Sequence, residues 1–194
     1  PSHLAQVSFV IQDHALGLGH AVLSAKEAVG DEPFAVFLPD DLIEDETPTI
    51  GQMIEVFGRF GGSVIAVKEV SDQEVPTKGI VAAAEIEERV YGITGLVEKP
   101  ALADAPSNLA IIGRYVLTPQ VFDTLEGTGQ GAISEIQLTD GIASLLPAQS
   151  LYAYRFPGAY FDLGTPPGML KASVHAALQR EDVAPDLREW LSGV

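Results

Sequence analysis

The sequence predicts an α/β fold with a mixed, mostly parallel sheet. Apolar runs at 7–11, 34–38 and 64–67 have the composition of strands that are buried on both faces. Apolar residues at helical spacing occupy 18–29 and 50–57, between these runs. The order strand, helix, strand with short loops is that of βαβ units.

Helix ends in the first half carry recognisable signals. Gly30 suits the C-terminal stop of the first helix, and Gly61-Gly62 suits that of the second. Thr47 followed by Pro48 predicts the start of the second helix, as a cap and a first-turn proline.

The second half mixes strands and helices without an obvious linker. We therefore predict one domain over residues 1–194. The expected elements are a strand pair at 79–86 and 90–97, a strand at 108–116, a helix from Thr118-Pro119, a connector at 127–131, a capping box from Ser134 to Gln137 before a helix to 146, a strand at 151–154, a helix opened by Pro167 and a last helix at 187–191.

Composition excludes several classes of function. The formal net charge is −16 and the 11 Lys and Arg residues are scattered, so a nucleic-acid polymer would be repelled. No apolar run is long enough to span a membrane. The sequence contains no Cys, which excludes a disulfide framework and thiol or Cys-zinc chemistry and fits a cytoplasmic protein.

Two aspartates are candidate metal ligands. Asp40 follows the apolar run 34–38, and Asp162 follows the aromatic pair Tyr160-Phe161. Mg²⁺ is commonly held by one or two carboxylates together with substrate phosphates, so this pair could hold one ion. The alternative is that each aspartate caps the helix that follows it.

Two further segments have the composition of ligand contacts. Gln12, Gly17 and Gly19 precede the first helix, where small residues let the backbone approach a flat or anionic ligand; a helix start without a ligand is the alternative. Glu98-Lys99-Pro100 offers a carboxylate for sugar hydroxyls and a cation for phosphate, or is an exposed turn.

Six motifs occur in one order over nearly the whole chain: Gly17-Leu-Gly-His-Ala-Val22, Leu38-Pro-Asp40, Val97-Glu-Lys-Pro100, Pro106-Ser-Asn-Leu-Ala-Ile-Ile-Gly-Arg-Tyr115, Glu135-Ile-Gln-Leu-Thr-Asp140 and Asp162-Leu-Gly164. Together they resemble the sugar-1-phosphate nucleotidyltransferases, in particular the bacterial UTP–glucose-1-phosphate uridylyltransferases (UDP-glucose pyrophosphorylases). The resemblance implies a Rossmann-like nucleotidyltransferase fold. It also implies a homo-oligomer, because members of that family commonly assemble as dimers or tetramers.

The resemblance also implies a reaction. The phosphate oxygen of glucose 1-phosphate attacks the α-phosphorus of UTP in line, pyrophosphate leaves and UDP-glucose forms. No general base is needed, because the sugar phosphate is already an anion, and Mg²⁺ with a lysine neutralises charge. The implied roles are uracil contacts for Gln12 and Gly17, Mg²⁺ ligation by Asp40 and Asp162, sugar contacts for Gly79, Glu98 and Gly113 with Asn108 nearby, and sugar-phosphate binding by Lys99; His20 is interpreted as a helix-start residue.

One departure from the family limits this expectation. The family's triphosphate-binding loop, of the type Gly-x-Gly-Thr-Arg…Pro-Lys, does not occur in the sequence. We therefore expect residues 1–194 to correspond to the C-terminal two-thirds of such an enzyme, with its N-terminal part missing and with little or no activity alone. The alternatives are a thymidylyl or other sugar-phosphate nucleotidyltransferase, and a non-catalytic remnant that binds sugar phosphate.

Overall fold

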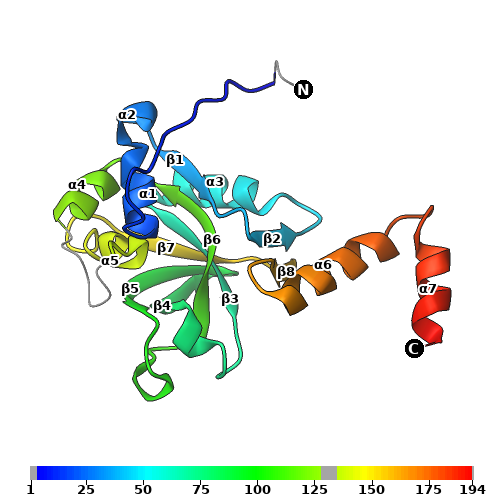
Figure 1. Cartoon of the computed structure of the whole chain (residues 1–194). Helices are drawn as coiled ribbons and strands as arrows, with labels where there is room; N and C mark the ends of the chain where they lie inside the picture. The colour runs from blue at the N-terminus through cyan, green and yellow to red at the C-terminus, as the bar shows by residue number, and fades with distance from the viewer. Residues whose placement is uncertain (1–3, 128–134, 194) are drawn as a thin grey trace.

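The computed structural model describes residues 4–127 and 135–193, and a mixed sheet lies at their centre (Figure 1). Within these residues the sheet has six strands in the order β1-β6-β3-β7-β5-β4. A two-stranded ribbon, β2-β8, lies beside it. The strands are β1 (Phe34–Phe37), β2 (Asp41–Glu44), β3 (Val64–Glu69), β4 (Gly79–Glu87), β5 (Val90–Glu98), β6 (Leu109–Leu117), β7 (Leu151–Arg155) and β8 (Ala159–Asp162).

Strand direction differs from the sequence prediction, although the mixed α/β class is confirmed. Among the pairings of the described residues only β3 and β7 run parallel, so the expectation of a mostly parallel sheet is wrong. β1 pairs antiparallel with β6 at the sheet edge, and Phe37 is 53% exposed, so this run is not buried on both faces. An apolar run favours burial, but it carries no information about the direction of its partner strand.

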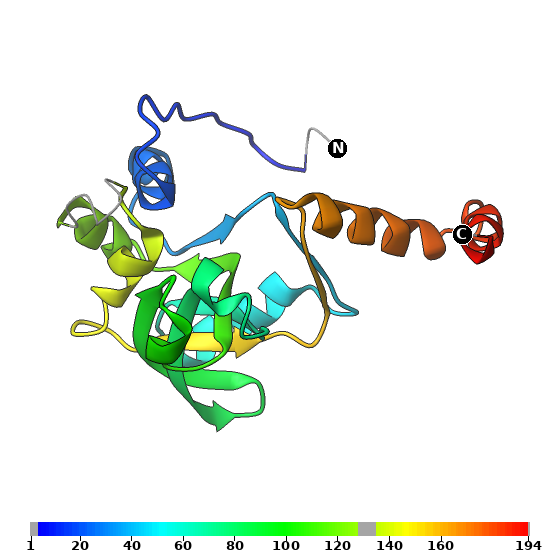
Figure 2. The same cartoon turned by 60° about the horizontal axis from the view of Figure 1, so that its bottom comes forward.

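The run 7–11 is not the predicted buried strand. No strand is assigned there, and Phe9 is 92% exposed. Figure 2 shows this segment passing along the outside of the fold, before α1. A strand requires a neighbouring backbone to complete its hydrogen bonds, and the described part of the chain pairs none with 7–11.

The helical predictions hold better, except that the N-cap of α3 is Pro48 and not the predicted Thr47. The predicted helix 18–29 is present but divided at Ala25 into α1 (Leu18–Ser24) and α2 (Lys26–Val29). Helix α3 (Thr49–Phe60) ends as predicted at Gly61, whose φ of 74° is in the left-handed region and whose N–H donates to Phe57 O. The buried side of α3 is centred on Met53 and Val56.

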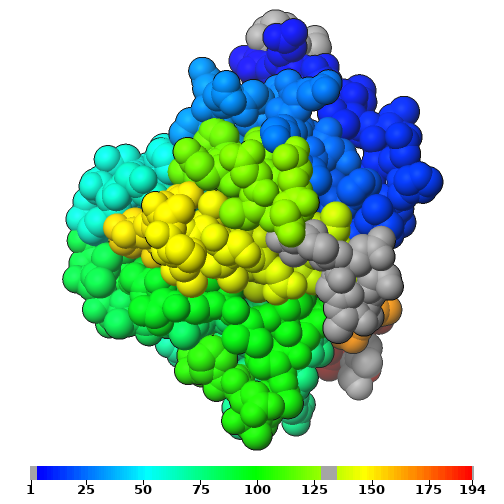
Figure 3. Space-filling view, turned by 90° about the vertical axis from the view of Figure 1, so that its left-hand side faces the viewer, coloured from blue at the N-terminus to red at the C-terminus, as the bar shows by residue number. Residues whose placement is uncertain are grey.

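Two apolar clusters cover opposite faces of the sheet. β3 supplies both, because Ile65 and Val67 point to one cluster and Val64 and Ala66 to the other. Helix α3 packs on the second face. Helices α1, α4 (Gln120–Gly127) and α5 (Leu138–Ala143) pack on the first, where Figure 3 shows them as adjoining bands. The result is a three-layer arrangement.

The C-terminal helices extend from this body. β8 leads into α6 (Pro166–Leu178), and α7 (Ala184–Ser192) follows at the far end (Figures 1 and 2). Short 3₁₀ helices occupy Val75–Thr77 (η1) and Leu102–Asp104 (η2). The predicted capping residue Ser134 and most of the connector 127–131 lie outside the described residues. In the described part of the chain, no helix combines the length and apolarity needed to cross a membrane.

Candidate functional site

The two predicted metal ligands lie together beside the β2-β8 ribbon. Asp162 is the last residue of β8 and pairs with Asp41, the first residue of β2, directly after Asp40. The N–H of Leu163 donates to the main-chain oxygen of Asp40 at 2.7 Å. A methyl group placed on Gly164 would lie 3.1 Å from Asp162 Oδ1 and 3.4 Å from Asp40 Oδ2. Both carboxylates therefore approach the same point.

The capping interpretation of these aspartates is wrong. The cap of α6 is Thr165, whose Oγ1 accepts the N–H of Gly168 at 3.2 Å. Asp162 instead closes a tight turn, with Oδ1 accepting the N–H of Gly164 at 3.0 Å. Asp40 precedes a strand and not a helix.

This donor set fits Mg²⁺ better than a metal with a complete protein cage. Around the described residues, no group of three or more His, Cys, Asp or Glu side chains is arranged to hold a metal ion. Two converging carboxylates leave the remaining positions to water and phosphate oxygens, which is the usual pattern for Mg²⁺. Asp40 and Asp162 are thus the residues that could hold it.

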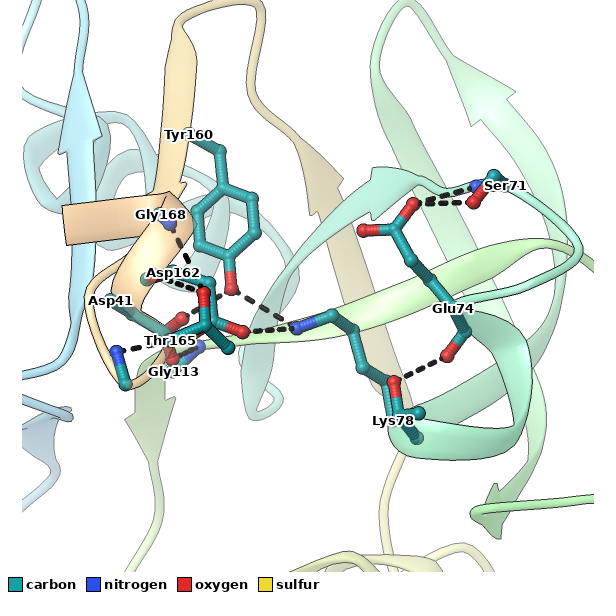
Figure 4. Close-up of polar contacts among 11 residues, drawn as sticks. Asp41, Ser71, Glu74, Lys78, Gly113, Tyr160, Asp162, Thr165 and Gly168 are labelled. Atoms are coloured by element: carbon teal, nitrogen blue, oxygen red, sulfur yellow. Dashed lines mark hydrogen bonds and ion pairs between the residues drawn. The ribbon is translucent and has the colours of Figure 1, made fainter. Parts of the chain in front are cut away.

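Asp41 fixes the loop that carries Asp40. Its Oδ2 accepts the N–H of Gly113 at 2.9 Å, and its Oδ1 accepts the hydroxyl of Tyr160 at 2.6 Å (Figure 4). The Arg114 guanidinium donates to the main-chain oxygens of Asp41 at 2.6 Å and Leu38 at 2.9 Å. Burial lowers the pKa of Arg114, and it raises the pKa of Tyr160 with help from the hydrogen bond to Asp41.

Lys78 reaches the ribbon from the start of β4. Its Nζ donates to Tyr160 Oη at 3.1 Å and lies 3.4 Å from Asp162 Oδ2, and its side chain is only 16% exposed (Figure 4). The turn before it is held by Glu74, which accepts the N–H and hydroxyl of Ser71 at 3.1 and 2.7 Å. These two hydrogen bonds lower the pKa of Glu74.

A cavity of about 160 Å³, with polar and apolar residues in its lining, includes Lys78 in its wall. Gly79 and Glu98 line it, as expected of sugar-contacting residues, and Glu98 Oε2 accepts the hydroxyl of Thr139 at 2.6 Å. Lys99 is not among the lining residues; its Nζ lies 3.6 Å from Glu98 Oε1, and its φ of 45° is in the left-handed region. The cavity lining is Leu18, Thr77, Lys78, Gly79, Glu98, Ile111, Tyr115, Gln137, Leu138 and Thr139.

Two predicted sugar contacts lie outside this cavity. Asn108 is exposed, and its main-chain oxygen accepts the N–H of Val70 at 3.0 Å. Gly113 contacts Asp41, and a methyl group there would lie 2.3 Å from Asp41 Oδ2. The structure thus gives Gly113 a structural reason to be glycine that is independent of any sugar.

The predicted nucleotide contacts lie together at the start of α1. Gln12 Nε2 donates to Gly17 O at 3.1 Å and lies 3.0 Å from Nδ1 of His20. Gly17 has a φ of 97° and is packed against residues 135–136, so a larger residue would not fit. Leu18, which follows Gly17, lines the same cavity as Glu98. The predicted nucleotide contacts and the predicted sugar contacts are therefore neighbours in the fold. His20 lies in the first turn of α1, as its interpretation as a helix-start residue requires.

Four residues of this site had no assigned role in the sequence prediction: Asp41, Lys78, Thr139 and Tyr160. Asp41 and Lys78 each adjoin a predicted residue, Thr139 lies within a quoted motif and Tyr160 lies two residues before Asp162, and this closeness in sequence was the available signal. Their contacts link segments distant in sequence, which periodicity and motif spacing do not report.

Paired carboxylates beside a cavity with a lysine in its lining form a site of the kind that can hold Mg²⁺ together with a phosphate. Residues 2–179 match the model of the nucleotidyl transferase family, and the chain belongs to that family. Among curated relatives, UTP–glucose-1-phosphate uridylyltransferase 2 of Staphylococcus saprophyticus is 45% identical over 190 residues, covering 98% of this chain and 66% of the relative. The UTP–glucose-1-phosphate uridylyltransferase of Staphylococcus epidermidis is 43% identical, covering 97% and 65%. The chain therefore spans just under two-thirds of the length of these relatives.

Solved structures similar to this chain come from the same kinds of enzyme. A crystal structure of a UDP-glucose pyrophosphorylase complexed with UDP-glucose has a TM-score of 0.86 and 40% identity, covering 89% of this chain and 66% of that one. The UDP-glucose pyrophosphorylase of Acinetobacter baumannii also has a TM-score of 0.86, with 38% identity, covering 100% and 67%. A putative glucose-1-phosphate thymidylyltransferase of Bacillus anthracis is less similar, with a TM-score of 0.68 and 26% identity, covering 85% and 63%.

Proposed function

We propose that this chain carries the metal and sugar-phosphate site of an enzyme that transfers a uridylyl group from UTP to glucose 1-phosphate, giving UDP-glucose and pyrophosphate. The observation that carries the proposal is the convergence of Asp40 and Asp162 next to the cavity that contains Glu98. The names of the relatives support the substrate class.

The proposed chemistry depends on positioning and charge. Glu98 accepts hydrogen bonds from sugar hydroxyls, and Thr139 orients its carboxylate. Lys99, next to Glu98, meets the sugar phosphate, whose oxygen attacks the α-phosphorus in line without a general base. Asp40 and Asp162 hold Mg²⁺, which when bound offsets the negative charge of the phosphates. Gln12 and Gly17 receive the uracil base.

Calorimetric titration of UDP-glucose, with and without Mg²⁺, tests this proposal. We expect Mg²⁺ to tighten binding to the wild-type chain, and we expect Asp162→Asn to abolish that tightening because half of the carboxylate pair is neutralised. Asp31→Asn, in an exposed turn after α2, makes the same charge change away from the site and should behave as wild type. Equal Mg²⁺ dependence in Asp162→Asn and wild type would contradict the proposal.

A thymidylyl enzyme is the nearest alternative, because a thymidylyltransferase is among the similar structures. Competition between UDP-glucose and dTDP-glucose separates the two. Preference for the uridine compound is expected, because the uridylyltransferase relatives are more similar to this chain. Tighter binding of dTDP-glucose than of UDP-glucose would favour a thymidylyltransferase and contradict the uridylyl assignment.

We further propose that the protein assembles as a homo-oligomer and works in the cytoplasm. Exposed apolar residues on the projecting helices support assembly: Trp190 is 64% exposed and Leu170 is 66% exposed. Sedimentation of wild type and Trp190→Glu tests this. A wild-type chain that stays monomeric at every concentration would contradict it.

A further inference from the structure

Lys78 is positioned between the two halves of the proposed site. Lys78 lines the cavity together with Glu98. Its ammonium group reaches Tyr160 and Asp162 (Figure 4). It therefore lies between the carboxylates proposed to hold Mg²⁺ and the space proposed to hold the sugar phosphate.

The contact of Lys78 with Asp162 is loose. Charge-assisted N–H···O bonds are typically ~2.7–2.9 Å long, whereas this one is 3.4 Å. Lys68 shows what a tighter lysine contact looks like in this protein, because its Nζ donates to Gly158 O at 2.7 Å. Lys78 is thus held near Asp162 by charge and by Tyr160, without a short bond that fixes it there.

Lys78 also lies beside the lysine proposed to bind phosphate. The N–H of Lys99 donates to the main-chain oxygen of Lys78 at 3.1 Å, so both lysines project from the same end of the β4-β5 hairpin. A cation bound by Asp162 and the ammonium of Lys78 would repel each other at such a separation. Substrate phosphate is the anion that Lys78 would meet from its place in the cavity lining.

We propose that Lys78 is a second phosphate-binding residue, which pairs with Asp162 while the metal is absent and moves to the substrate phosphate when the metal binds. This inference rests on the proposed function. It assigns to one side chain both an ion pair with Asp162 and a contact with phosphate.

The first arm of the test measures Mn²⁺ affinity by electron paramagnetic resonance without substrate. Lys78→Met should bind Mn²⁺ about fivefold more tightly, because the competing ammonium is gone. Lys78→Arg keeps the charge and should stay near wild type. Lys171→Met, on the exposed side of α6, makes the same net-charge change at a distance and should also match wild type.

The second arm measures glucose 1-phosphate affinity in Mn²⁺ by calorimetry, with methyl glucoside as the ligand without phosphate. Lys78→Met should weaken glucose 1-phosphate binding about tenfold, as expected when a phosphate loses one cation partner. Binding of methyl glucoside, followed by ligand-observed NMR, should be unchanged.

The outcomes separate the two proposals. Wild-type affinities for both Mn²⁺ and glucose 1-phosphate in Lys78→Met would overturn the role of Lys78 and leave the proposed function standing. Equal weakening of glucose 1-phosphate and methyl glucoside would assign Lys78 to the shape of the cavity and also overturn its phosphate role. If the wild-type chain fails to bind glucose 1-phosphate, the proposed function and the phosphate contact both fail.

Discussion

Tyr160 and Asp41 hold each other next to the proposed metal ligands. The tyrosine hydroxyl donates to Asp41 at 2.6 Å and also accepts a hydrogen bond from Lys78 at 3.1 Å. Neither residue needs to touch a substrate to matter, because together they fix the spacing between β2, β8 and the start of β4. Tyr160 and Asp41 lie outside the six sequence motifs, so the motifs do not reveal this contact.

Tyr160 makes the stability of the fold decrease as the pH becomes alkaline. Burial, followed by the hydrogen bond to Asp41, raises the pKa of Tyr160 above its ordinary value of 10.0. Its contribution to the free energy of unfolding is therefore complete below that value, and it declines at higher pH, where the unfolded chain loses the proton first.

Urea unfolding of wild type and Tyr160→Phe measures this contribution as a difference in the free energy of unfolding. Near neutral pH the variant should be less stable by about 1 kcal/mol, the usual net contribution of one hydrogen bond. This difference should shrink as the pH rises above 10.0. A difference that stays constant would show that the hydroxyl does not titrate differently in the two states.

At the scale of elements, β6 must approach the loop between β1 and β2 closely. A methyl group on Gly113 of β6 would lie 2.3 Å from Asp41 Oδ2 and 2.5 Å from Leu38 side-chain atoms. Gly113→Ala should therefore lower the free energy of unfolding by about 1–3 kcal/mol, the range for overpacking, and weaken Mg²⁺-dependent binding by displacing Asp41.

Gly95→Ala is the matched control for that substitution. Gly95 also lies in a strand, β5, but a methyl group there would meet Ala82 at an ordinary 3.6 Å. This variant should retain metal-dependent binding and wild-type stability within about 0.5 kcal/mol. Similar losses in both variants would show that the close approach at Gly113 has no special role.

The elements were predictable where local chemistry decides them. The end of α3 at Gly61 follows from glycine, and the core strand β3 follows from its apolar composition. The β4-β5 pair was also predicted. The strand predicted at 7–11 is not formed, because an apolar run becomes a strand only if a partner backbone is present. Strand direction in β1 depended on its pairing with β6, far along the chain.

The site was predictable to the same extent. Asp40, Asp162 and Glu98 came from quoted motifs and Gly79 from the family resemblance, and the structure places them in one region. Lys78 and Thr139 join the site through long-range contacts, which a motif does not report. The roles of all these residues stay predictions.

At the scale of the whole molecule, the central claim is that three segments form one binding site. The predicted nucleotide contacts lie at the start of α1, the proposed sugar cavity lies where β4 begins and β5 ends, and the carboxylate pair lies at the β2-β8 ribbon. Lys78 and Leu18 connect these parts, because each lines the cavity and adjoins another segment.

Amide hydrogen exchange with UDP-glucose and Mg²⁺ tests this claim most directly. The account predicts slower exchange in three regions together: residues 12–20, the hairpin end at 78–79 and 98–99, and the ribbon at 160–164. A larger groove of about 790 Å³, lined by residues including Ile86, Thr94 and Tyr152, provides the contrast. Protection confined to that groove, or found in none of the three regions, would contradict the account.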